Sequence, residues 1–187
     1  MKKFFVGALF LLMLLTFTGC GSKKEVTPKK EKETIKGNCT VFECIKNIEV
    51  TDTVEQVNEK MGFDGSLDKE AESYKIYKWE VTKDSYVEIQ FNNGGKSNIK
   101  IEFNKEKIAD SKLDLSSFDE MRTIVQKGEM TYSKFCEMVG NVEGTLVEKS
   151  SFSNKYLWYS ASNNYLYGTF SASSNKCTFV SGLRNQQ

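Results

Sequence analysis

A short aromatic segment occurs twice in this chain, and the interval between its copies sets the size of a structural unit. The segments Tyr77-Lys78-Trp79 and Tyr156-Leu157-Trp158 lie 79 residues apart and contain both tryptophans of the protein. A phenylalanine follows each tryptophan by twelve residues, at Phe91 and Phe170. A pattern that recurs at one interval indicates an internal repeat. We therefore expect two copies of one unit.

The residues upstream of each aromatic segment repeat as well. Glycines enclose an acidic residue in Gly62-Phe63-Asp64-Gly65 and again in Gly140-Asn141-Val142-Glu143-Gly144. A threonine opens a helical stretch before each of these turns, over Thr53 to Met61 and Thr131 to Val139. These helical stretches lie 78 residues apart, so one inserted residue reconciles their offset with that of the aromatic segments.

Helix-start signals open both copies. Capping boxes, in which a hydroxyl and a second side chain bond the first free N–H groups of a helix, are predicted at Thr40, Thr53 and Ser117. Thr131 starts the second helix of the second copy, and Gly62 is a natural C-terminal stop. Each copy is therefore expected to begin with two short helices.

Alternating β-branched and aromatic residues then predict about four strands in each copy. The expected strands are 65–72, 74–82, 86–92 and 98–104, followed by 145–150, 155–161, 165–171 and 176–183. The sequence thus predicts an α+β fold of two tandem repeats, each a short helix pair packed on a roughly four-stranded antiparallel sheet. The first repeat is expected over 38–105, a polar connector over 106–116, and the second repeat over 117–187.

This order of elements resembles the tandem-repeat fold of the beta-lactamase inhibitor protein and of the related SmpA/OmlA-like envelope lipoproteins. The resemblance rests on the threonine-led helices, the glycine-bounded turns, the Tyr-x-Trp strands and the closing phenylalanines, and it covers about residues 39–184. It implies a binding protein of the cell envelope, because the family includes protein inhibitors and outer-membrane assembly factors. The inhibitor's binding loops have no residue-by-residue match in this chain, so beta-lactamase inhibition is a minor alternative.

The first residues have the features of an export signal. Two lysines precede an apolar run from Phe4 to Phe17, which is too short to span a ~30 Å hydrocarbon core as a helix. The stretch Phe17-Thr18-Gly19-Cys20 resembles a bacterial lipobox, although the lipobox prefers leucine where Phe17 stands. We predict a signal peptide over 1–19 and a lipidated Cys20 whose acyl chains anchor the exported protein to the cell membrane. The alternative is an ordinary secreted protein that is cut nearby.

A lysine-rich segment follows, and we expect a flexible linker over 20–37. Residues 21–36 contain six lysines, three glutamates, the only proline and no aromatic residue. Such a segment buries too little apolar surface to offset its ordering entropy. From residue 37 onward, 18 basic and 22 acidic residues leave a net charge of −4, which argues against nucleic acid as a partner.

Four cysteines remain besides Cys20, and they allow three disulfide pairings. Cys136 is expected on the helix side and Cys177 on the outer sheet face, so these two point away from each other. Cys39 and Cys44 close a small loop only if the first helix starts late. Because the chain has no histidine, a metal site has few candidate ligands, and we expect neither a metal nor a cofactor.

Strand side chains alternate between the two faces of a sheet, so the sequence assigns each side chain to a face. In the first copy one face is apolar and the other is charged. In the second copy Trp158 points to the helices, and both tryptophans are interpreted as core anchors. The opposite face has aromatic residues where the first copy has charges, and its candidate partner-binding residues are Leu157, Tyr159, Tyr165, Tyr167 and Phe179. An exposed apolar patch marks an interaction site; the alternative is that this face packs against the first repeat, the linker or a second molecule.

No catalytic pattern is present in the sequence. There is no histidine for a Ser-His or Cys-His pair, no nucleophile elbow and no Walker-type glycine loop. We therefore predict a lipid-anchored, non-enzymatic binding module that contacts a protein of the cell envelope. One alternative is a sensor of a small ligand or a cell-wall glycan that uses the tyrosine-rich face, and another is a histidine-free hydrolase. The oligomeric state is left open.

Overall fold

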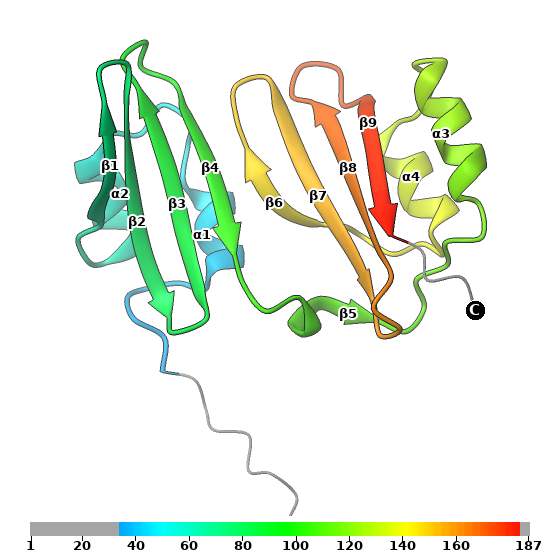
Figure 1. The fold of residues 1–187 in the computed structure, drawn as a ribbon, viewed down its shortest axis with the longest axis horizontal. Coiled ribbons are helices and arrows are strands. Elements are labelled where there is room, and N and C mark those ends of the chain that lie inside the picture. The colour runs from blue at the N-terminus through cyan, green and yellow to red at the C-terminus, as the bar shows by residue number, and fades with distance from the viewer. Residues whose placement is uncertain (1–33, 184–187) are drawn as a thin grey trace, which may run out of the picture. The chain divides into compact units, whose positions relative to one another are not determined.

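The computed structural model describes residues 34–183, in which a pair of helices precedes a run of strands twice (Figure 1). Within this range the fold is α+β, with four α-helices and a mainly antiparallel sheet of nine strands. The helices are α1 (Val41–Asn47), α2 (Val54–Met61), α3 (Phe118–Gln126) and α4 (Tyr132–Met138), with a 3-10 turn η1 (Lys105–Ile108). The strands are β1 (Ser66–Ala71), β2 (Tyr74–Thr82), β3 (Ser85–Asn92), β4 (Ser97–Glu102), β5 (Ala109–Asp110), β6 (Thr145–Lys149), β7 (Ser153–Ser160), β8 (Tyr165–Ser171) and β9 (Cys177–Leu183). The predicted signal peptide, Cys20 and most of the predicted linker lie outside the described residues.

The last residues of the predicted linker are part of the fold. The Lys36 amide donates a hydrogen bond to the Val81 carbonyl oxygen at 2.8 Å. The Lys36 ammonium lies 4.5 Å from the centre of the Phe63 ring, a cation–π contact. The chain therefore joins the folded part before residue 38, which is the start that the sequence predicted for the first repeat.

Side-chain caps start three of the four helices within residues 34–183, as the sequence predicted. Thr40 and Thr53 each form a complete capping box with the third residue of the helix that follows. The Thr131 hydroxyl accepts from the Lys134 N–H at the start of α4. Gly62 ends α2 with a positive φ of 79°, a conformation that a glycine adopts without strain.

The predicted capping box at Ser117 is wrong. The Ser117 side chain makes no capping hydrogen bond, and its backbone has φ −89° and ψ 15° instead of the extended conformation of the other caps. A turn causes this difference, because the Phe118 N–H bonds the Leu115 carbonyl oxygen at 3.3 Å and folds the backbone at Ser117. A cap residue needs an extended backbone for its oxygen to reach the third helical N–H.

One sheet joins the strands in the order β1-β2-β3-β4-β6-β7-β8-β9, with antiparallel neighbours along this path (Figure 1). The short strand β5 instead pairs with β7 in parallel, with Ala109 opposite Tyr159. Strand β6 begins opposite Leu157, so β5 pairs with the part of β7 that extends beyond β6. The segment that the sequence predicted to be a polar connector therefore adds η1 and one short strand to the fold.

The two halves of the sheet meet at a short junction. Strands β4 and β6 are paired at Ile99↔Lys149 and Lys100↔Glu148. The Lys149 ammonium reinforces the junction, because it donates to the Ile48 carbonyl oxygen at 3.0 Å and contacts the Glu49 carboxylate at 3.2 Å. The end of α1 is thereby tied to β6, 100 residues further along the chain.

Each half has its own hydrophobic cluster, centred on a buried tryptophan. Trp79 is 0% exposed and Trp158 is 1% exposed, as expected for core anchors. The indole N–H of Trp79 donates to Asn58 Oδ1 at 2.9 Å, and that of Trp158 donates to the Val142 carbonyl oxygen at 2.8 Å. Both clusters form within residues 34–183, so this segment has the apolar interior that independent folding requires.

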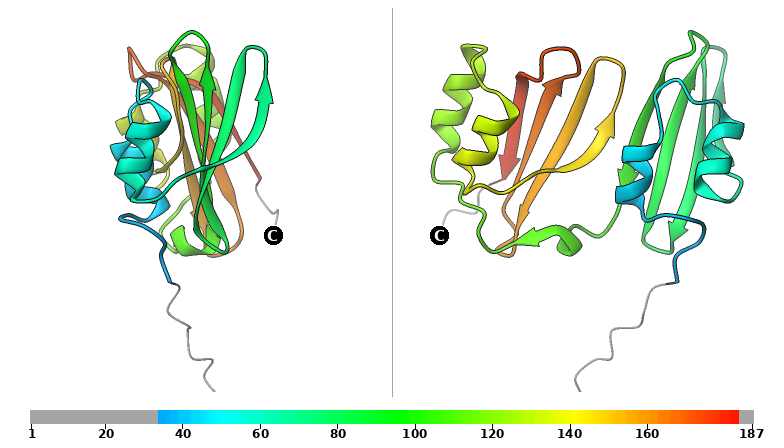
Figure 2. Two further views of the ribbon diagram at one scale, coloured as in Figure 1. Left: turned by 90° about the vertical axis from the view of Figure 1, so that its left-hand side faces the viewer. Right: turned by 180° about the vertical axis from the view of Figure 1, so that it is seen from behind.

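The α-helices leave one face of the sheet open. Figure 2 shows α1, α2 and α4 on the same side of the strands, and α3 lies beside β9. The apolar face that the sequence predicted in the first half packs on the helices, and its residues are buried or half-buried in the first cluster, namely Tyr77, Trp79, Val87, Ile89, Phe91, Ile99, Ile101 and Phe103. The alternation of the strands thus predicted the core side correctly there.

The predicted outward position of Cys177 is wrong. Cys177 is 2% exposed and belongs to the cluster around Trp158. The register between β8 and β9 shifts by one residue between Thr169 and Phe170, so Cys177 pairs with the inward-facing Phe170 while Phe179 pairs with the outward-facing Thr169. This bulge puts Cys177 and Phe179 on opposite faces although they are two residues apart.

Candidate functional site

The open face of β7, β8 and β9 holds a group of aromatic and apolar side chains. Tyr159 lies opposite Tyr165, and Tyr165 lies opposite Leu183 on the next strand. Paired residues in antiparallel strands share a face, so these side chains form one surface. We call this surface the aromatic face and define it by five residues: Tyr159, Tyr165, Tyr167, Phe179 and Leu183.

The side chains of the aromatic face are accessible to different extents. Phe179 is 59% exposed and Leu183 is 49% exposed, and both rank among the exposed large hydrophobic side chains of the described residues. The three tyrosines are half-buried. Tyr165 and Tyr167 pack edge to face with ring centroids 5.5 Å apart, and the Tyr159 hydroxyl bonds Asn163 Oδ1 at 2.7 Å. The tyrosine rings are therefore held in place before any partner arrives.

Two lysines lie over the tyrosine rings. The Lys105 ammonium, from η1, is 5.4 Å from the Tyr165 ring centre and 5.9 Å from that of Tyr167. The Lys155 ammonium is 4.9 Å from the Tyr167 ring centre and also pairs with the Glu148 carboxylate at 2.8 Å. Cation–π contacts at accessible sites contribute about 0.5–1 kcal/mol each. The aromatic face thus presents cationic as well as apolar groups.

Leu157, which the sequence placed among the partner-binding residues, is not accessible. It is 2% exposed and belongs to the first hydrophobic cluster together with Ile101 and Val147. Ile108 of η1 packs against the same cluster, and η1 lies close to β7. Its burial removes Leu157 from the candidate surface. The alternative of packing within the chain applies to Leu157 and in part to Tyr159, Tyr165 and Tyr167, which are half-buried against the same cluster.

A polar groove lies beside the aromatic face, where the two halves of the sheet meet. Its volume is about 360 Å³, and it is lined by side chains of β3, β4 and β6 to β8, among them Glu88, Gln90, Asn98, Lys100, Lys155 and Thr169. Lys155 lines the groove and also contacts the aromatic face, since its ammonium lies 4.9 Å from the centre of the Tyr167 ring. Hydrogen-bonding groups and aromatic rings are therefore adjacent on the open side of the sheet.

Sequence reasoning missed Leu183 of the aromatic face and the two lysines, Lys105 and Lys155, that lie over its tyrosine rings. Leu183 was detectable, because it follows Phe179 by four residues in a strand and so shares its face. Lys105 was not, because it is the last residue of the predicted first repeat and is brought to the tyrosines by η1, which the sequence did not predict. Lys155 was placed in a strand without any role at the surface.

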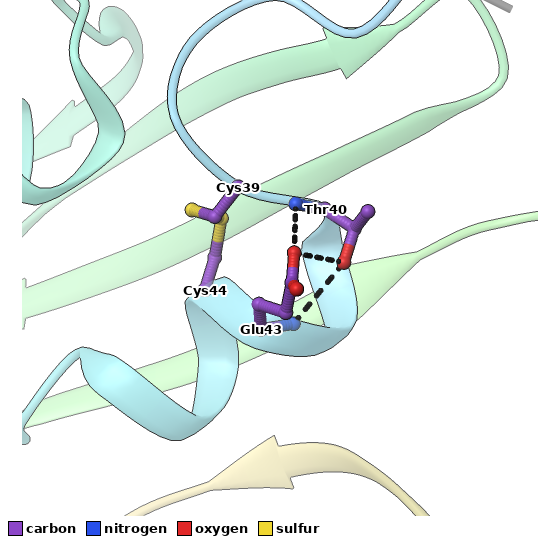
Figure 3. The surroundings of a disulfide bond; sticks show 4 residues. All are labelled: Cys39, Thr40, Glu43 and Cys44. Atoms are coloured by element: carbon purple, nitrogen blue, oxygen red, sulfur yellow. Dashed lines mark hydrogen bonds between the residues drawn. A yellow bond between two sulfur atoms is a disulfide. The ribbon is translucent and has the colours of Figure 1, made fainter.

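The cysteines take one of the pairings that the sequence left open. Cys39 and Cys44 form a disulfide with Cα atoms 5.8 Å apart (Figure 3). Helix α1 starts at Val41, directly after its predicted cap Thr40, so the helix does not start late and the predicted condition for this bridge was wrong. The bridge joins Cys39, which precedes the cap, to Cys44 inside the helix. Figure 3 shows the disulfide beside the capping box of Thr40 and Glu43.

Cys136 and Cys177 are free thiols. Burial raises the pKa of the Cys177 thiol to about 11, and burial also raises the pKa of Cys136. Thiols with raised pKa values are poor nucleophiles near neutral pH. The described residues 34–183 contain no group of three or more acidic or cysteine side chains arranged to hold a metal ion.

None of the helices within residues 34–183 is long and apolar enough to cross a membrane. No protein-family model, no curated protein and no solved structure matches this chain.

Proposed function

We propose that this chain is a lipid-anchored, non-enzymatic binding module of the cell envelope, and that its aromatic face contacts another envelope protein. The observation that carries the proposal is the exposure of Phe179 and Leu183 next to three tyrosines on a face that no α-helix of the described residues covers. Exposed apolar patches with a polar rim are typical of interaction sites. Tyrosine and phenylalanine offer large contact areas and lose little side-chain entropy on binding.

The chemistry of the surface suggests how a partner is held. A stable interface buries about 1,200–2,000 Å² in total. This area is larger than the accessible surface of five side chains, so the contact extends into the charged surface around the aromatic face. Lys105 and Lys155 lie at the tyrosine rings and offer ammonium groups to acidic side chains of the partner. Apolar anchors in the centre and charges at the rim form the usual anatomy of such interfaces.

Two features support an exported protein. The Cys39–Cys44 disulfide is typical of oxidising compartments outside the cytosol. The lipobox-like Phe17 to Cys20 precedes a lysine-rich segment that leads to the first described residues. We propose that lipidated Cys20 anchors the folded part to the membrane through this segment as a tether.

We also propose that the folded part is a tandem repeat, of the kind found in the beta-lactamase inhibitor protein and the SmpA/OmlA-like lipoproteins. Two helices followed by four antiparallel strands occur in each half, with β5 between them. In each half a glycine, Gly65 or Gly144, lies against the ring of the buried tryptophan. Equivalent contacts at equivalent positions support a common origin of the two halves.

A second candidate function, binding of a cell-wall glycan, is favoured by the polar groove beside Tyr167. Glycan sites combine aromatic rings with a few convergent hydrogen-bonding groups in a concave surface. The groove offers Gln90, Asn98 and Thr169 as neutral donors and acceptors. This alternative uses the same side of the sheet but a different set of residues.

A pull-down from envelope extract of the source cell tests the proposal. The bait is the chain from residue 21, compared with a Phe179→Ser/Leu183→Ser variant. A Phe152→Ser/Leu67→Ser variant is the matched control, because it removes one exposed phenylalanine (79%) and one leucine of the same exposure (49%) from other parts of the surface. We expect a protein that the wild type and the control retain and that the aromatic-face variant retains at least about tenfold less.

Two results contradict the protein-binding proposal. If all three baits retain every protein equally, the aromatic face does not contribute to binding. Co-sedimentation of the wild type with purified cell wall, lost in a Gln90→Ala/Asn98→Ala variant but kept in the aromatic-face variant, favours the glycan alternative instead. Circular dichroism of each variant confirms that the fold is retained.

The anchor has its own test. The full chain, expressed in a bacterium with lipoprotein processing, is expected to fractionate with membranes, and a Cys20→Ser variant is expected to be released. Release of both proteins, or retention of both, rules out anchoring through Cys20.

A further inference from the structure

A second concave site lies on the helix side of the sheet, opposite the aromatic face. It is a groove of about 480 Å³ between α1 and α4, with strands β6 and β7 as its floor. Figure 2 shows these strands between the two helices, with no helix in front of them. The volume is within the range of about 300–1,000 Å³ that is typical of small-molecule sites. We call this site the helix-side groove.

Five of the nine residues that line the helix-side groove are apolar or aromatic. Phe42 of α1 forms one wall, and Tyr132 of α4 with Tyr156 of β7 forms the other. Ile108 and Leu146 complete the apolar lining. A flat apolar molecule therefore finds aromatic surface on both sides.

The aromatic walls are held in place by contacts within the chain. Phe42 packs edge to face on Phe103, with ring centroids 4.8 Å apart. Tyr132 packs on Tyr156 at 4.7 Å, and its hydroxyl accepts from the Gly144 N–H at 3.1 Å. A site whose walls are already ordered loses less entropy on binding a ligand.

Two side chains of opposite charge line this groove, and they come from different elements. Lys46 is in the last turn of α1, and Glu143 is in the loop between α4 and β6. Neither side chain forms an ion pair within the part of the chain that the structure describes. Both charges are thus available to a ligand, one to an anionic group and the other to a cationic group.

We propose that the helix-side groove binds a small zwitterion with a flat apolar body, of the kind exemplified by a free aromatic amino acid. The anionic group of the ligand pairs with Lys46, the cationic group pairs with Glu143, and the apolar body lies between Phe42 and the Tyr132–Tyr156 pair. This site is independent of the aromatic face, because it lies on the other side of the sheet and uses none of its residues.

The test is a titration of the chain from residue 21, followed by two-dimensional 1H–15N NMR. Four probes separate the contributions: phenylalanine, 3-phenylpropanoate, 2-phenylethylamine and alanine. We expect phenylalanine to saturate the site at ligand concentrations up to about 10 mM. The chemical-shift changes should be centred on the amides of Lys46, Tyr132 and Gly144. The two phenyl compounds that lack one charge are expected to bind about two- to fivefold more weakly, the factor for an accessible ion pair, and alanine is expected not to saturate.

Two variants locate the site. Lys46→Met and Glu143→Gln each remove one charge and retain most of the side chain, and both positions are exposed, so the fold is expected to persist. Lys46→Met should equalise the affinities for phenylalanine and 2-phenylethylamine, and Glu143→Gln should equalise those for phenylalanine and 3-phenylpropanoate. Lys78→Met, on the open face, is the control and should leave all four titrations unchanged.

The following results overturn the proposal. The binding of phenylalanine does not saturate, or its chemical-shift changes lie outside the groove, or the singly charged probes bind as tightly as phenylalanine. Unchanged titrations in both groove variants overturn it as well, because they place the binding elsewhere. None of these results affects the protein-binding proposal for the aromatic face.

Discussion

At the scale of single residues, each buried tryptophan depends on a glycine whose missing side chain makes room for the indole ring. A Cβ atom on Gly65 would lie 2.4 Å from Trp79, and one on Gly144 would lie 2.6 Å from Trp158. Asn58 Oδ1 additionally accepts from both the Gly65 N–H and the Trp79 indole, at 3.0 and 2.9 Å. The glycine-bounded turns of the sequence are thus explained by close packing as well as by turn geometry.

Replacing Gly65 by alanine should therefore be costly. We expect Gly65→Ala to lower the free energy of unfolding by about 1–3 kcal/mol, because the Trp79 ring must move within a packed core. Gly94→Ala is the control, since a Cβ atom there meets nothing within 4 Å, and it should change the stability by less than about 1 kcal/mol. Urea unfolding followed by tryptophan fluorescence measures both. Equal stability of the two variants would contradict this account of the glycine.

The buried Cys177 thiol should make the free energy of unfolding fall at alkaline pH. Its pKa is about 11 in the folded chain against an ordinary value of 9.0. The unfolded chain loses this proton first, so the contribution of the neutral thiol is complete below about pH 9 and is lost as the pH rises through about 11. We expect the stability difference between the wild type and Cys177→Ala to shrink by about 2–3 kcal/mol between pH 8 and pH 11. Urea unfolding at both pH values measures it, and a constant difference would refute the assignment.

At the scale of helices and strands, local signals decide most helix starts, and the neighbouring backbone decides the exception. Thr53 and Ser117 stand before comparable sequences, yet only Thr53 caps its helix. The bulge between β8 and β9 acts similarly on a strand, because one additional residue moves Cys177 to the core side. Neither the turn before α3 nor the bulge has a distinct signature in the sequence.

The two helix starts should respond differently to alanine. Thr53→Ala removes the hydroxyl that accepts from the Gln56 N–H, and it should lower the free energy of unfolding by about 1 kcal/mol. Ser117→Ala removes no capping bond and should change the free energy of unfolding by less than about 0.5 kcal/mol. Thermal unfolding of the two variants under identical conditions is sufficient to compare them. A larger loss at Ser117 than at Thr53 would show that the cap assignment is wrong.

At the scale of the whole described fold, the short β4–β6 junction makes Lys149 important. Its side chain is only 18% exposed, and it satisfies the Ile48 carbonyl oxygen besides pairing with Glu49. Most other ion pairs of the described residues, such as Lys75–Glu70, lie on the exposed surface. The Lys149–Glu49 pair, in contrast, joins the end of α1 to β6 across the junction.

We expect Lys149→Met to lower the free energy of unfolding by about 1–2 kcal/mol, because it leaves a buried carbonyl oxygen without its donor. Lys75→Met removes an exposed pair and should cost less than about 1 kcal/mol. Hydrogen exchange of the β4 and β6 amides should rise in the first variant and stay unchanged in the second. Equal exchange in both variants would remove Lys149 from the junction.

Much of this architecture was predictable from patterns that act over short distances. The capping threonines, the strand intervals, the buried tryptophans and the α+β class follow from local hydrogen bonding and from the period of two in strands. The same period placed Tyr159, Tyr165, Tyr167 and Phe179 on the open face of the sheet. For these residues, the face on which a side chain lies follows from its position in its own strand.

Tertiary structure decided what depends on segments far apart in the chain. Leu157 has the pattern of a surface residue, but it is buried in the first hydrophobic cluster with Ile101 of β4 and Val147 of β6, and η1 brings Lys105 to the tyrosines. Cys177 is inside because of its register with β8, and the helix-side groove exists because α1 and α4 stand on either side of β6. The sequence by itself determined which face each regular strand residue takes, since alternation is local. Only the fold decided which of those faces stay accessible, since covering a face requires a second segment whose path is set by long-range pairing.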